Sequence, residues 1–239
     1  PRDPAVIQTQ VVLAVIGARA PALWFTTTPQ GLLVGMLTVC ALVFVYVAVG
    51  MKWYARVQKI CFYLGMVGLG LVFALLLMGN KESFIAGLNS NLPALYGIPP
   101  GDYYGATIAA GQAAGTTFGP LGTVALGASF ALIPMVVFFN LWPNWGSTLY
   151  GEVRGASDYK KNFWGMAWAV IVTAGLALVF FLLINKTMGW DFYMNANGAF
   201  WSNIFYGTDV PIPVWPYPVQ FATFLTTSRV LQFIVVLLV

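Results

Sequence analysis

The chain has 239 residues, of which 59% are apolar and only 8% are Asp, Glu, Lys or Arg, and its mean hydropathy is +0.80. A soluble domain carries roughly a quarter charged residues, so this composition excludes an ordinary water-facing surface. The net charge of +4 comes from scattered basic residues that form no stripe, which excludes nucleic-acid binding. The absence of histidine excludes His-dependent catalytic triads and His-ligated metal sites.

Four stretches are long and apolar enough to span a membrane, since crossing about 30 Å of hydrocarbon takes about 20 residues. They cover about 31–50, 53–78, 120–150 and 163–185. Residues 5–18 and 230–239 are interpreted as the end of an earlier span and the start of a later one. The sequence therefore predicts an all-α polytopic membrane protein, in which 1–239 is a single transmembrane domain and a fragment of a larger protein.

The connections between these stretches alternate in charge. Residues 51–59 and 151–162 are rich in Lys and Arg. The longer connections 79–119 and 186–217 each hold one basic residue and two acidic residues. Basic residues concentrate in cytoplasmic loops. We therefore expect loops 51–59 and 151–162 to be cytoplasmic and loops 79–119 and 186–217 to be extracellular.

The two outer connections are predicted to contain short helices. Residues 102–110 favour a helix with Asp102 as its N-cap, and 190–206 favours an interfacial helix. A proline-rich turn over 210–218 follows, and then a short helix over 217–227. The next span is expected to start near Ser228 and Arg229, with Ser228 as its N-cap. One continuous helix from Phe221 would instead leave Arg229 near the bilayer centre, at a cost of about 2.5 to 3.5 kcal/mol.

The stretch 120–150 is interrupted by Pro143, with polar residues beside it. A proline removes one helical hydrogen bond, and unpaired backbone survives in hydrocarbon only where it is buried or lines a wet cavity. Helices broken at mid-membrane commonly bind substrates or ions, although an ordinary proline kink would fit equally well. The candidate substrate-binding residues are Phe138, Phe139, Asn140, Trp142 and Asn144.

Two motifs resemble a known family, the amino acid-polyamine-organocation transporters or amino acid permeases. Residues 50–59, with the sequence Gly-Met-Lys-Trp-Tyr-Ala-Arg-Val-Gln-Lys, are similar to that family's loop between the fourth and fifth spans. Residues 151–156, which include Glu152 and Arg154 and precede Lys160 and Lys161, are similar to the signature that ends the sixth span. The sequence Leu141-Trp142-Pro143-Asn144 departs from the small, Gly-containing break common in the family, which leaves the substrate open.

The resemblance implies part of a leucine-transporter-type inverted-repeat helical bundle, covering the fourth to seventh of about twelve spans and the start of the eighth. It also implies a two-armed helical lid before the eighth span, formed here by 190–206 and 217–227. The expected function is secondary transport of an amino acid or related amine across the cell membrane by alternating access. The alternative is a membrane scaffold, receptor or channel-like subunit whose kinked helix only packs.

No enzymatic activity, metal or other cofactor is expected, since the chain lacks histidine and no predicted span contains an acid. Coupling to sodium or protons would use a site outside this chain. The expected partners are the small-molecule substrate and the lipid bilayer.

Overall fold

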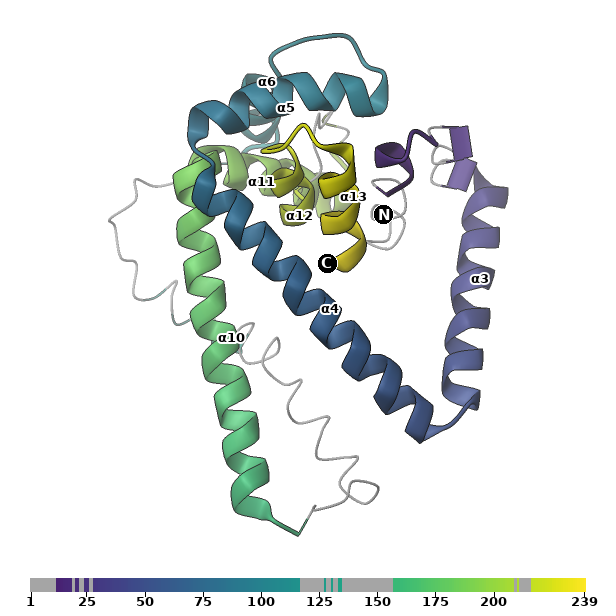
Figure 1. Cartoon of the computed structure of the whole chain (residues 1–239). Coiled ribbons are helices and arrows are strands. Elements are labelled where there is room, and N and C mark those ends of the chain that lie inside the picture. The colour runs from purple at the N-terminus through teal and green to yellow at the C-terminus, as the bar shows by residue number, and fades with distance from the viewer. Residues whose placement is uncertain are drawn as a thin grey trace. The chain divides into compact units, whose positions relative to one another are not determined.

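The computed structural model of the chain describes residues 12–18, 20–21, 24–25, 28–116, 127, 130, 133–134, 157–208, 210 and 216–239. All regular elements in these residues are helices (Figure 1). They are α3 (Pro29–Ala48), α4 (Met51–Met78), α5 (Lys81–Tyr96), α6 (Tyr103–Ala113), α10 (Tyr159–Met188), α11 (Trp190–Tyr206), α12 (Pro218–Thr223) and α13 (Arg229–Leu238). The predicted all-α class is confirmed in this part of the chain, while the inverted-repeat bundle stays a prediction.

The chain divides into two compact units. The first consists of Pro1–Thr116 and Leu183–Val239, and the second of Thr117–Leu182. Helix α10 crosses the boundary and contributes only its last residues to the first unit. The described part of the second unit is mainly the remainder of α10, so all helix packing discussed below belongs to the first unit.

Three helices have the length and composition of membrane spans: α3, α4 from Lys52 onward, and α10. Their apolar side chains are largely exposed, and Gly31 is the one buried residue along α3. Such exposure would be very costly in water but is normal for helices surrounded by lipid or by other membrane helices. The chain is therefore membrane-embedded. Most of the third predicted span, 120–150, lies outside the described residues.

A tight turn, rather than a loop, joins α3 to α4. Gly50 has φ +95°, a backbone conformation that favours glycine, and α4 begins at the next residue. The Tyr46 hydroxyl donates a hydrogen bond to the Tyr54 carbonyl oxygen at 3.2 Å, and their rings lie 4.9 Å apart. The prediction of a loop over 51–59 was therefore wrong. These residues form the first turns of α4, because nothing after Gly50 interrupts the helix.

The connection 79–119 contains two helices where the sequence predicted one. Helix α5 begins with a capping box, in which Asn80 and Ser83 each bond the other's backbone amide, and it ends at Gly97 with φ +69°. Helix α6 begins at the predicted N-cap, since the Asp102 carboxylate accepts a hydrogen bond from the Gly105 amide at 3.1 Å. Asp102 as an N-cap is confirmed, whereas α5 was missed.

The C-terminal part follows the predicted division into short helices. Helix α11 lies between Gly189 and Gly207, both in left-handed backbone conformations, and has the predicted bounds. Helix α12 ends at Thr223, and α13 starts anew at Arg229, where Ser228 accepts a hydrogen bond from the Leu231 amide at 3.4 Å. The prediction that no continuous helix runs from Phe221 is confirmed.

Candidate functional site

The residues predicted to form the substrate site lie outside the described part of the chain. They are Phe138, Phe139, Asn140, Trp142 and Asn144, together with Pro143 at the helix break and Glu152 and Arg154 of the following motif. The broken helix therefore stays a prediction. The described residues instead bring together a second region of interest, at the end of α4.

This region, here called the cap, consists of α5, α6, α11, α12 and the first turn of α13. Figure 1 shows these helices gathered at the end of α4 that is remote from α3. Helix α11 packs along α6, α5 contacts α6, and α12 contacts both α4 and α13. The cap thus encloses its own small core, with helices from three separate stretches of the chain.

Four aromatic rings from four helices form the centre of the cap. Phe192 of α11 stacks on Tyr104 of α6 with ring centroids 4.8 Å apart, and meets Phe84 of α5 and Phe221 of α12 edge-on at 5.3 and 5.4 Å. Each such pair contributes about 0.5 to 1.5 kcal/mol beyond the burial of its area. The Tyr104 hydroxyl also donates to the Met188 carbonyl oxygen at 2.9 Å. One cluster therefore joins α5, α6, α11 and α12.

Two side chains near the end of α10, here called the latch, bind the last carbonyl groups of α4. The Lys186 ammonium donates to the Leu77 carbonyl oxygen at 2.6 Å, and the Thr187 hydroxyl donates to that of Leu76 at 3.0 Å. The last carbonyls of a helix have no partner within it and carry a partial negative charge, so a cation there is favourable. The latch thus fixes the end of α10 to the end of α4.

A buried glutamine joins α12 to α13. Gln232 is fully buried, and its amide nitrogen lies 3.1 and 2.8 Å from the carbonyl oxygens of Thr223 and Thr226. Its amide oxygen accepts a hydrogen bond from Arg229 at 2.8 Å, and Asn91 of α5 lies within 3.4 Å of its amide nitrogen. Gln232 therefore bonds the last carbonyl of α12 and one carbonyl of the connection that follows, which helps a short helix to end in a buried place.

Helix α13 runs antiparallel to α4. Leu225, in the connection from α12, packs against Gly79 at the end of α4, and Leu238 packs against Gly68 further back. Arg229 therefore lies at the same end of α4 as the latch. This agrees with the prediction that Arg229 is level with Lys186 and remote from Lys52. The Arg229 guanidinium bonds the side-chain oxygen of Gln232 rather than an acidic residue.

Two buried side-chain oxygens of the cap have no hydrogen-bond partner among the described residues, that of Asn195 on α11 and that of Gln220 on α12. The Gln220 amide nitrogen of α12 donates to the Tyr96 hydroxyl of α5 at 2.7 Å, but its amide oxygen has no hydrogen-bond partner among the described residues, although the side chain is only 1% exposed. Burial raises the pKa of Tyr96 to about 12, and the bond to Gln220 opposes this rise. An unpaired buried acceptor costs about 1 to 3 kcal/mol, so this contact is a weak point between α5 and α12.

Small residues set the closest approach of cap helices. A methyl group on Gly111 of α6 would lie 2.3 Å from the Asn195 side-chain oxygen of α11, and one on Gly198 would lie 2.2 Å from the Thr116 hydroxyl. Glycine at these two positions therefore lets α6 and α11 lie side by side. The sequence analysis did not predict this interface.

These features define a class: a membrane-embedded, all-helical protein with a packed helical cap at one end of a span. Comparisons with protein-family models, with curated proteins and with solved structures found no match. The resemblance to amino acid permeases thus rests on the two motifs at 50–59 and 151–161.

Proposed function

We propose that the chain is part of a secondary active transporter that moves an amino acid or related amine across the cell membrane by alternating access. The observation that carries this proposal is the pair of cap helices α11 and α12. Helix α11 begins after Gly189 and packs against α6, α12 packs against α4, and a new helix follows at Arg229. Transporters with the resembled fold carry a two-armed helical lid in this place.

A lid must be held closed in one state of the transport cycle and released in another. The cap contains both strong and weak contacts. The aromatic cluster joins α11 to α5, α6 and α12, whereas Asn195 on α11 and Gln220 on α12 each have a buried side-chain oxygen without a partner among the described residues. Elements that move in a functional cycle come from the less stable parts of a structure. We therefore infer that each arm has a contact weak enough to be released.

The proposed substrate site is the predicted broken helix, with Asn140 and Asn144 beside Pro143. Asparagine side chains and freed backbone groups would bind the polar atoms of the substrate, while Phe138, Phe139 and Trp142 would contact its side chain or form an outer gate. The described parts of α3, α4 and α10 contain no Asp or Glu. A proton-carrying carboxylate, if coupling uses one, would belong to another span.

The test is uptake of a labelled amino-acid panel by the full-length protein in liposomes, with and without sodium and pH gradients. We expect concentrative uptake of one substrate class that depends on one of these gradients. Asn140→Leu should reduce uptake at least tenfold in initial rate while leaving membrane insertion intact. Asn185→Leu, the same change at an exposed position near the end of α10, is the matched control and should retain uptake.

Three results would contradict the proposal in different ways. Uptake that never exceeds equilibrium and ignores both gradients would indicate a channel-like subunit. No uptake of any compound by well-folded protein would favour a scaffold or receptor. Equal loss of protein and of activity in Asn140→Leu would mark Asn140 as a structural residue and move the substrate site elsewhere.

A further inference from the structure

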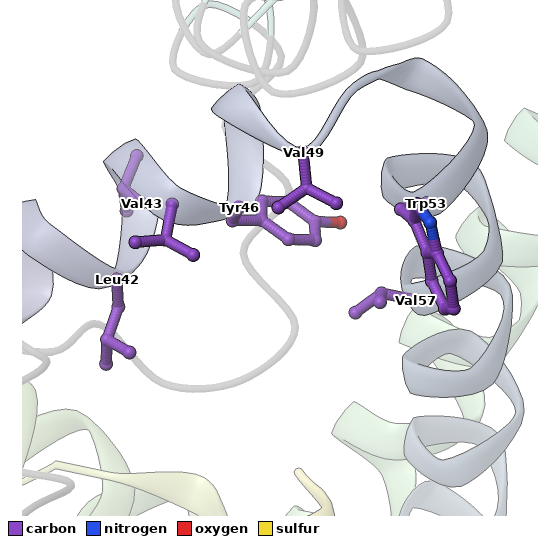
Figure 2. A pocket seen from close by; sticks show the side chains of 7 residues that line it. Leu42, Val43, Tyr46, Val49, Trp53 and Val57 are labelled. Carbon is purple, nitrogen blue, oxygen red and sulfur yellow. The ribbon is translucent and has the colours of Figure 1, made fainter.

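An open apolar groove lies where α3 turns into α4. Figure 2 shows side chains from both helices around one hollow, with Val43 and Tyr46 on α3 facing Trp53 and Val57 on α4. Its volume is about 470 Å³, within the range of about 300 to 1,000 Å³ that is typical of small-molecule sites. The Tyr46 hydroxyl is already bonded to Tyr54, so the groove offers an almost purely apolar wall.

Basic side chains stand beside this groove, and they form no ion pair with an acid among the described residues. Lys52, Arg56 and Lys59 recur at the spacing that places residues on one face of a helix, and all three are exposed. The sequence contains no Asp or Glu between Asp3 and Glu82. The Arg56 guanidinium lies 4.7 Å from the centre of the Trp53 ring, which is part of the groove wall. Positive charge and apolar surface therefore adjoin each other.

The length of α4 places these cations at the membrane interface. A helix of 28 residues is about 42 Å long, whereas the hydrocarbon core is about 30 Å thick. The opposite end of α4 lies among the polar residues of the cap. The part of α4 that extends beyond the hydrocarbon core is therefore its first turns. Trp53, Tyr46 and Tyr54 are also the aromatic types that gather at headgroup level.

We propose that the elbow groove, formed by α3 and the first turns of α4, binds an anionic phospholipid. One acyl chain would lie along the apolar wall, and the headgroup phosphate would accept hydrogen bonds from Lys52 and Arg56. A second copy of the chain fits the groove poorly, because a two-fold pairing there would bring two basic clusters together without an acid to separate them. The inference does not depend on the proposed transport activity.

The experiment is native mass spectrometry of the full-length, delipidated protein titrated with phosphatidylglycerol or phosphatidylcholine of the same chain length. Two variants test the two halves of the site. Lys52→Gln with Arg56→Gln removes the charge, and Val43→Trp fills the groove without changing charge. Lys160→Gln with Lys161→Gln, two exposed cations at the start of α10, is the charge-matched control.

We expect wild type to bind phosphatidylglycerol more tightly than phosphatidylcholine. Removing the two charges should weaken phosphatidylglycerol binding by roughly fivefold per charge. Val43→Trp should weaken binding of both lipids, and the control pair should bind as wild type does. The proposal would be overturned by equal affinity for the two lipids, by wild-type binding in Val43→Trp, or by an equal loss in the control pair, which would indicate diffuse charge attraction. A change of oligomeric state in Val43→Trp would instead identify the groove as an interface between copies.

Discussion

Arg229 donates a hydrogen bond to the side-chain oxygen of Gln232, three residues further along α13, at 2.8 Å. This leaves the amide nitrogen of Gln232 facing the carbonyl oxygens of Thr223 and Thr226. The neutral side chain of Gln232 thus connects Arg229, at the start of α13, to carbonyl groups at and just after the end of α12. The cation is held without a buried ion pair, which would carry a large desolvation cost.

Gln232→Leu should destabilise the cap. The substitution keeps an apolar volume in place but removes the bonds from Gln232 to the Thr223 and Thr226 carbonyl oxygens. The Thr223 oxygen keeps its bond from the Thr226 amide, whereas the partly buried Thr226 oxygen loses its side-chain partner. A buried acceptor left unpaired costs about 1 to 3 kcal/mol, so we expect a fall in the thermal unfolding midpoint of purified protein. Val230→Ala, at a position of the same helix that is 69% exposed, should change the midpoint little. An unchanged midpoint in Gln232→Leu would show that the network contributes nothing net.

Arg229 and Lys186 should be accessible from one side of the membrane and Lys52 from the other. Residues 52 and 78 of α4 lie about 39 Å apart at 1.5 Å per residue, and Lys186 binds the far end of that helix. Single cysteines at positions 52, 186 and 229 should therefore react with a membrane-impermeant thiol reagent from opposite faces, with 186 and 229 behaving alike. Outer labelling of 186 and 229 in intact cells would also support the predicted orientation.

The labelling needs a background without the native cysteines, because Cys40 and Cys61 are both exposed. Both lie on helices whose surroundings are lipid or other membrane segments, so an apolar context did not imply burial. Labelling of position 229 together with position 52 would contradict the arrangement of α4 and α13.

The sequence predicted those elements whose ends are marked by local chemistry. Helix α11 has the predicted bounds because Gly189 and Gly207 flank it in left-handed conformations that other residues rarely adopt. The starts at Asp102 and Ser228 were predicted because each side chain caps its own helix, a contact made within three residues. Such signals need no knowledge of the rest of the fold.

The missed features depend on contacts between distant parts of the chain. Helix α5 carries polar residues and Pro93, so it resembles a loop by composition, and only the Asn80 capping box marked its start. Asn91 and Gln232 are separated by 141 residues, and no local pattern indicates that they meet. A polar residue in the apolar run 230–239 was the available signal, because buried polar groups require partners. The substrate site of the proposed transporter remains a prediction, since its residues lie outside the described part.

Gly87→Ala should disrupt the contact of α5 with the connection between α12 and α13. A methyl group on Gly87 would lie 1.9 Å from the Phe224 carbonyl oxygen, which is backbone and cannot turn aside. Overpacking of this kind costs about 1 to 3 kcal/mol, measurable as a lower unfolding midpoint. The matched control is Gly70→Ala on α4, where nothing lies within 4 Å and the change should be neutral or slightly stabilising. Equal effects of the two substitutions would argue against this packing.

The cap should lose stability at alkaline pH through Tyr96. Burial raises the pKa of this phenol to about 12 from its ordinary value of 10.0. Below pH 10 the phenol is neutral in both folded and unfolded states, so its contribution is fully present. Between about pH 10 and 12 the unfolded state loses its proton first, and stability falls by about 1.4 kcal/mol per pH unit from this group.

Tyr96→Phe removes this titration and serves as the test. The variant also loses the hydrogen bond from Gln220, so it should be less stable than wild type at neutral pH, by about 1 kcal/mol. Its unfolding midpoint should nevertheless fall less steeply than that of wild type above pH 10, so the difference between the two should shrink as the pH rises. Parallel midpoint curves for the two proteins up to pH 12 would show that Tyr96 ionises equally well in both states, and that the junction between α5 and α12 is open to solvent.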